Sequence, residues 1–126
     1  MSNEKITKLV KDSLKFYDGK YFKLIAYCIM SNHVHVIVDQ EGYQDISLSD
    51  IFGRIKGFSA YESNKIIGKK GEFWSQEIYD HYTRSNSDLE FYIKYTLNNP
   101  VAANLVDNWR DWPHSFVLEE YIDDGF

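Results

Sequence analysis

The stretch CIMSNHVHVIVD, residues 28–39, decides the fold prediction, because it reads as a strand end, a short turn and a second strand. Side chains alternate between the two faces of a strand, so the three valines of this run share one face. His33 and His35 lie on the other face together with Ile37. The valine face is typical of a protein core, and the histidine face must therefore be a half-open surface or a functional site.

The hydrophobic spacing on either side of this stretch predicts alternating helices and strands. Ser47 is a typical N-cap, residues 87–90 form a capping box, and Pro100 discourages a helical conformation in the residue before it. Ser31 and Asn32 have the composition of a tight hairpin turn. The expected elements are a helix over residues 3–17, strands over 21–30 and 33–39, a helix over 47–67, a strand over 77–84 and a helix over 87–99.

Length and composition predict one ordinary globular domain over residues 1–126, since 44% of the residues are hydrophobic and 26% are charged. No apolar run approaches the roughly 20 residues that a membrane span needs, so we expect no membrane partner and a cytoplasmic location. The single Cys28 cannot form an internal disulfide, and we expect a buried structural thiol.

The net charge of −5 argues mildly against a nucleic-acid partner, because phosphate binding draws on lysine and arginine. Basic residues nevertheless gather in residues 54–70, which leaves room for a local basic surface. Each candidate phosphate contact also reads as a solvated surface charge; the candidates are Arg54, Lys56, Lys65 and Arg84. Four aromatic residues could stack on unpaired bases or simply pack on the core: Phe73, Trp74, Tyr79 and Tyr82.

A helical wheel of the third helix brings Tyr95 and Asn99 together beside its buried stripe, one turn apart. A phenol and an amide would thus emerge where they could meet the histidine face of the sheet. Two imidazoles are too few for a metal site, so a third ligand must come from elsewhere in the chain. Taken alone, Tyr95 also reads as a residue at the core margin, and Asn99 as a helix cap before proline.

Three separated segments carry a family resemblance: AYCIMSNHVHVIV at residues 26–38, YIKYTLNNPVAANLV at 92–106 and WPHS at 112–115. In this order and spacing they resemble the single-tyrosine HUH transposases of insertion sequences, called IS200-like, and most of all the REP-associated tyrosine transposases. The likeness covers nearly the whole chain, from about residue 5 to residue 116.

The resemblance implies an α+β, ferredoxin-like antiparallel sheet with helices on one face. It implies a metal-dependent nuclease and strand transferase that acts on single-stranded DNA with hairpin structure. His33, His35 and Asn99 match the metal ligands, and Tyr95 matches the nucleophile that forms a 5′-phosphotyrosine. Mg²⁺ or Mn²⁺ is the ion that fits the resemblance, although ligand softness alone would also allow Zn²⁺. Glu41 and Glu77 are reserve ligands should Asn99 not serve.

One departure from the family pattern leaves alternatives open. These transposases begin with a strand before the first helix, whereas this sequence starts almost at the helix, so one sheet edge would be bare. Another segment or a second copy in a homodimer would then cover that edge, or the chain is a truncated, inactive relative that binds nucleic acid. A histidine-triad hydrolase is a third reading, although Ile37 stands where that motif has a histidine.

Overall fold

The computed structural model describes the backbone of residues 4–30, 33–43, 47–67, 75–80 and 86–122. The predicted turn at residues 31–32 lies outside these ranges. The elements, in chain order, are α1 (Glu4–Tyr17), β1 (Lys23–Ile29), β2 (His33–Asp39), α2 (Leu48–Ile67), β3 (Ser75–Asp80), α3 (Asn86–Ala102), η2 (Trp109–Asp111), β4 (Ser115–Val117) and η3 (Glu119–Tyr121).

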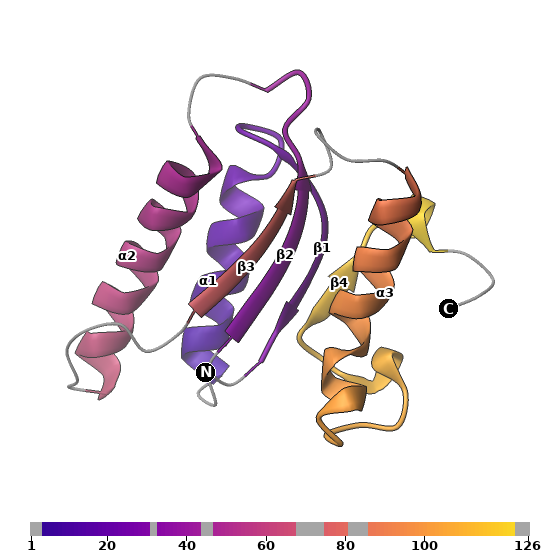
Figure 1. Cartoon of the computed structure of the whole chain (residues 1–126). Helices are drawn as coiled ribbons and strands as arrows, with labels where there is room; N and C mark the ends of the chain where they lie inside the picture. Colours follow the sequence, from indigo (N-terminus) through magenta and orange to yellow (C-terminus); the bar gives the residue numbers. More distant parts are fainter. Residues whose placement is uncertain (1–3, 31–32, 44–46, 68–74, 81–85, 123–126) are drawn as a thin grey trace.

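The strands form one sheet in the order β3-β2-β1-β4, which confirms the α+β class (Figure 1). β1 pairs antiparallel with both β2 and β4. The sheet is mixed rather than antiparallel throughout, because β3 runs parallel to β2. A parallel pair needs a crossover connection, and α2 lies in the chain between these two strands. The sequence predicted one bare sheet edge without saying which strand would have it; in the structure, β3 of the same chain covers the edge of β2 that faces away from β1.

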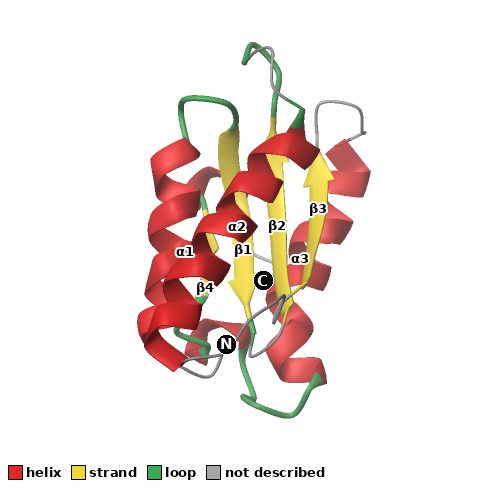
Figure 2. Ribbon diagram, turned by 90° about the vertical axis from the view of Figure 1, so that its left-hand side faces the viewer, coloured by secondary structure: helices red, strands yellow, loops and turns green. Residues whose placement is uncertain are grey.

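Helices cover both faces of the sheet, whereas the prediction placed them on one. Figure 2 shows α1 and α2 in front of the strands and α3 behind them. The valine face of β2 packs in one core cluster with residues of α1 and α2. Ile37, on the histidine face, belongs to a second cluster with Leu89, Ile93 and Leu97 of α3. Both faces of β1 and β2 are buried. The apolar spacing of a helix predicts that one of its sides is buried, but it does not predict which face of the sheet the helix covers, and so this arrangement was missed.

A bulge in β1 helps to supply both clusters. The register between β1 and β2 shifts between Leu24 and Ala26, so that Ile25 and Ala26 both belong to the α3 cluster. Leu24 and Tyr27 on either side belong to the α1 and α2 cluster. An extra residue of this kind locally breaks the strict alternation of side chains along a strand.

The helix ends follow recognisable capping rules. The Ser47 hydroxyl accepts a hydrogen bond from the backbone N–H of Asp50 at 3.1 Å, which confirms the predicted N-cap of α2. At its other end α3 continues past Pro100 to Ala102, two residues beyond the proline that was expected to stop it. It closes where Asn104, at φ 61°, lets the Leu105 N–H reach the Pro100 carbonyl at 2.9 Å.

Two sequence predictions about the core and the membrane can be compared with the structure. Cys28 is fully buried, as expected, and burial raises the pKa of its thiol to about 11. Among the described helices, none combines the length and the apolar character that crossing a membrane requires.

Candidate metal centre

Two imidazoles stand side by side at the start of β2, on the sheet face that α3 covers. The ring centroids of His33 and His35 are 4.4 Å apart, with their planes tilted by 43°. His33 is half-buried and His35 is only 7% exposed. The pKa of His35 is lowered, mainly because burial disfavours the charged ring and also because His33 would add a second positive charge; Glu77 acts in the opposite direction. A neutral imidazole is the form that binds metal ions.

Glu77 joins the two histidines because β3 pairs in parallel with β2. This pairing places Glu77 directly beside His35 in the register, and the Glu77 Oε2 lies 3.0 Å from the His35 Nδ1. One donor atom from each of His33, His35 and Glu77 lies within 4.8 Å of the others. Two ligand atoms on opposite sides of one ion are separated by about 4 Å. A small movement of the side chains toward one another would therefore let the three donor atoms bind a single cation. The Glu77 side chain is 58% exposed, which leaves this cluster open to solvent.

The other reserve ligand, Glu41, is not brought to this cluster. It lies beyond the far end of β2, six residues from His35, which is about 20 Å along an extended chain. Its backbone N–H bonds to the Asp39 carboxylate, and its side chain is exposed.

Tyr95 reaches the histidines from α3. Its ring lies edge-on to the His35 ring, with centroids 5.9 Å apart and planes at 86°. The buried residues of α3, among them Ile93 and Leu97, hold the helix against the sheet, whereas Tyr95 on its flank remains 45% exposed. This arrangement agrees with the helical wheel, which brought the phenol toward the histidine face.

Asn99 lies one turn after Tyr95, and its amide is engaged with its own helix. The Nδ2 donates to the Tyr95 carbonyl at 3.0 Å and to the Thr96 carbonyl at 3.3 Å. Pro100 has no N–H, so it cannot make the bond that a helical residue normally donates to the carbonyl at position 96. Asn99 supplies this bond, which gives it a structural role; its role as a metal ligand stays a prediction.

A cavity of about 470 Å³ lies between β2, β3 and α3, and His35, Glu77 and Tyr95 are among the residues that line it. It brings the imidazole, the carboxylate and the phenol to one space that also has aromatic walls. The residues that matter for its chemistry are His35, Glu77, Tyr79, Phe91, Tyr92 and Tyr95.

The predicted DNA contacts lie elsewhere or outside the described residues. Arg54 and Lys56 belong to α2, which covers the opposite face of the sheet from the histidines. The side chain of Lys65 and the whole of Arg84 are outside the described part of the chain, as are Phe73, Trp74 and Tyr82. Tyr79 is 8% exposed and stacks on Tyr92 with centroids 4.4 Å apart, so it packs rather than offering a free face.

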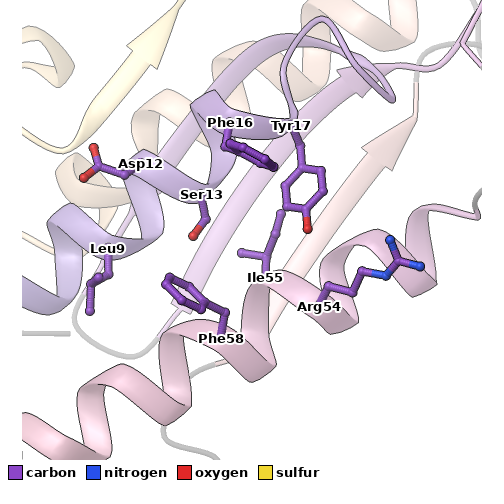
Figure 3. Close-up of a pocket in the computed structure, with 8 residues that line it drawn as sticks. All are labelled: Leu9, Asp12, Ser13, Phe16, Tyr17, Arg54, Ile55 and Phe58. Carbon is purple, nitrogen blue, oxygen red and sulfur yellow. The ribbon is translucent and has the colours of Figure 1, made fainter.

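A second cavity, of about 580 Å³, lies between α1 and α2 (Figure 3). Its lining is largely apolar, with Leu9, Phe16 and Phe58 prominent and with Asp12 and Arg54 also present. It is larger than the first cavity, but it lies across the sheet from the histidines and Tyr95 and brings no comparable set of donor atoms together.

Comparison with known proteins agrees with this geometry. Residues 2–99 match the family model described as "Transposase IS200 like". The chain belongs to this transposase family. It is also 26% identical over 102 residues to a Haemophilus influenzae protein named "Putative REP-associated tyrosine transposase". That match covers 75% of this chain and 58% of the relative, so the chain spans less than two thirds of the relative's length. No solved structure matches the chain significantly. The predicted family is therefore confirmed.

Two features of the site were predicted only in part, or not at all, from the sequence. Glu77 was only a reserve ligand, because its place beside His35 depends on a parallel pairing between strands that are far apart in the chain. Phe91 was not considered at all, although it stands one turn before Tyr95 and lines the same cavity. Its spacing of four residues from the predicted nucleophile is the signal that could have found it.

Proposed function

We propose that this chain is a metal-dependent transposase that cleaves and rejoins single-stranded DNA, with Tyr95 as the nucleophile. One observation carries the proposal: the Tyr95 ring lies against His35, which itself belongs to a set of three clustered donor residues. Membership of the transposase family supports the same reading. We further propose that its substrates are hairpin-containing element ends and that it acts in the cytoplasm, where these would be found.

The donor set suits a divalent cation. Two neutral imidazoles with one carboxylate accept Mn²⁺ well and Mg²⁺ acceptably, since imidazole favours later transition metals and carboxylate favours harder ions. His33, His35 and Glu77 would hold the ion, and Asn99 is the proposed further ligand. Once bound, the ion would polarise the scissile phosphate and stabilise the charge that develops on it.

Tyr95 would carry out the covalent step. An unperturbed phenol has a pKa near 10 and is a weak nucleophile at neutral pH, so its proton must be lost as attack proceeds. The partial exposure of Tyr95 leaves water able to accept that proton. The Tyr95 oxygen forms a bond to phosphorus while the bond from phosphorus to the 3′ oxygen breaks. The leaving 3′ oxygen takes up a proton from water, which gives a 5′-phosphotyrosine and a free 3′-OH. Attack by a 3′-OH then reverses the exchange and rejoins DNA without ATP, because one ester replaces another.

The proposed site is built from β2, β3 and α3 of one chain, so a second copy is not required to complete it. A homodimer stays a prediction that light scattering of the purified protein would check. The histidine-triad reading loses support, because Ile37 is 1% exposed and packs in the core beneath α3.

A non-catalytic nucleic-acid-binding domain is the second candidate. The observation in its favour is that the Asn99 amide, expected on the metal, bonds to carbonyls of its own helix. Such a protein would bind single-stranded DNA and form no covalent product.

The deciding experiment incubates the protein with Mn²⁺ and a labelled pool of single-stranded hairpin oligonucleotides of random sequence. We expect a labelled species of increased mass on a denaturing gel, absent from Tyr95→Phe and from reactions with chelator. Tyr92→Phe is the matched control, because it removes a hydroxyl from the same helix and the same cavity, and it should keep the adduct. DNA binding without any adduct would favour the second candidate, and an adduct that persists in Tyr95→Phe would refute Tyr95 as the nucleophile.

A further inference from the structure

The cavity beside the donor cluster is lined by three aromatic rings that the proposed chemistry does not use, Tyr79, Phe91 and Tyr92, and Phe91 is the most exposed of them. Phe91 is 63% exposed, more than Tyr92 or Tyr95 on the same helix. It lies one turn before Tyr95, with ring centroids 6.5 Å apart and planes only 12° from parallel. Water is a poor environment for a phenylalanine ring, so this exposure leaves apolar surface next to the proposed reacting group.

The rings around Phe91 form a row that leads from the core to solvent. Tyr79, buried beneath α3, stacks on Tyr92 at 4.4 Å, and Tyr92 in turn meets Phe91 edge to face at 5.3 Å. Tyr92 therefore supports Phe91 from one side. Phe91, Tyr92 and Tyr95 all line the same cavity, and Phe91 is the most exposed of the three.

We propose that Phe91 stacks on an unpaired base of a nucleotide flanking the phosphate that Tyr95 attacks, and so fixes the register of the strand. This inference rests on the proposed function and extends it to a residue that positions the substrate. The distance between the two rings is within the span of a single nucleotide, so a phosphate at Tyr95 brings a neighbouring base to Phe91. Stacking tolerates every base, because each has a π-face, and Phe91 would thus set position rather than sequence.

A single strand suits this surface better than a duplex does. In a duplex the base faces are covered by their neighbours and only the base edges are open in the grooves. Phe91 offers an apolar ring without a donor or an acceptor, which can recognise a base face and cannot read an edge.

The experiment uses an oligonucleotide recovered by binding, not by cleavage, from the random single-stranded pool. Versions of it carry the fluorescent base 2-aminopurine, or an abasic residue, at successive positions of the unpaired tail. Binding is measured with Mn²⁺ in the Tyr95→Phe background, where the proposed cleavage cannot interfere. Phe91→Leu keeps an apolar side chain without a π-face, and Phe91→Trp keeps the stacking surface. Phe58→Leu is the matched control, since Phe58 is 53% exposed on the opposite side of the sheet.

We expect protein to quench 2-aminopurine at one tail position, and Phe91→Leu to abolish this quenching and weaken binding about tenfold. Phe91→Trp and Phe58→Leu should retain both. An abasic residue at that position should weaken the parent about as much as Phe91→Leu does, with no further loss when the two are combined. Three results would overturn the inference. The first is equal binding by Phe91→Leu and Phe58→Leu; the second is that the affinity losses from Phe91→Leu and from the abasic residue multiply when the two are combined; the third is that the protein binds no DNA at all. If wild type forms no adduct and the quenching pattern still holds, the nuclease proposal fails and the stacking surface stands.

Discussion

At the scale of single residues, the site depends on which side chains share a face and a register. His33 and His35 share a face because strand side chains alternate, and this could be predicted from their spacing alone. Glu77 joins them through the pairing of β3 with β2, which no local pattern in the sequence specifies. The donor from the neighbouring strand was therefore the hardest of the three clustered residues to predict.

The role of Glu77 leads to a prediction about metal binding. Glu77→Gln keeps the shape of the side chain and removes its charge, so we expect the Mn²⁺ affinity measured by calorimetry to fall by about tenfold or more. Glu41→Gln makes the same change in an exposed carboxylate outside the cluster and should leave the affinity unchanged. Equal affinities in Glu77→Gln and wild type would exclude Glu77 as a ligand.

At the scale of elements, α3 shows why its end was predicted too early. The sequence rule ends a helix before a proline, because the proline ring disfavours a helical conformation in the preceding residue. Pro100 also removes one backbone donor. Asn99 compensates by donating its amide to the Thr96 carbonyl, and Asn104 closes the helix further along the chain. This compensation depends on the rotamer of the Asn99 side chain, and helix propensities of residue types do not predict it.

This compensation predicts that the effects of substitutions at Asn99 and Pro100 are coupled. Asn99→Ala should lower the free energy of unfolding by about 1 kcal/mol, because the Thr96 carbonyl loses its donor. In a Pro100→Ala background the backbone N–H of residue 100 can take over this bond, and the cost of Asn99→Ala should shrink. Urea denaturation of wild type, Asn99→Ala, Pro100→Ala and the double variant measures the coupling between the two substitutions. If their changes in the free energy of unfolding are strictly additive, the Asn99 amide does not replace the N–H that Pro100 lacks.

At the scale of the whole molecule, the sheet separates two cores with different tasks. The α1 and α2 side is an apolar cluster, in which Phe22 and Phe52 stack with centroids 5.8 Å apart. The α3 side combines a smaller cluster with the candidate metal centre. The order of the three helices and of β1 to β3, and the approach of Tyr95 to the histidines, could be predicted from the sequence. The strand β4 and the parallel placement of β3 could not, because both pairings join segments that are far apart in the chain.

The larger core should control stability. Phe52 is 1% exposed, so Phe52→Ala should lower the free energy of unfolding by about 3–5 kcal/mol through the cavity that it leaves. Phe58→Ala, on the same helix but 53% exposed, should change it by about 0.5 kcal/mol or less. Thermal and urea denaturation would measure both. Similar losses in the two variants would contradict the assignment of Phe52 to the core.

Our central proposal is that the phenol of Tyr95 and the cluster of His33, His35 and Glu77 serve one metal ion at one site. A crystal of the protein grown with Mn²⁺ and examined by anomalous diffraction tests it most directly. We expect a single strong manganese peak among the donor atoms of these three residues, beside the ring of Tyr95. A peak elsewhere on the molecule, or a cluster that stays empty at saturating Mn²⁺, would contradict it.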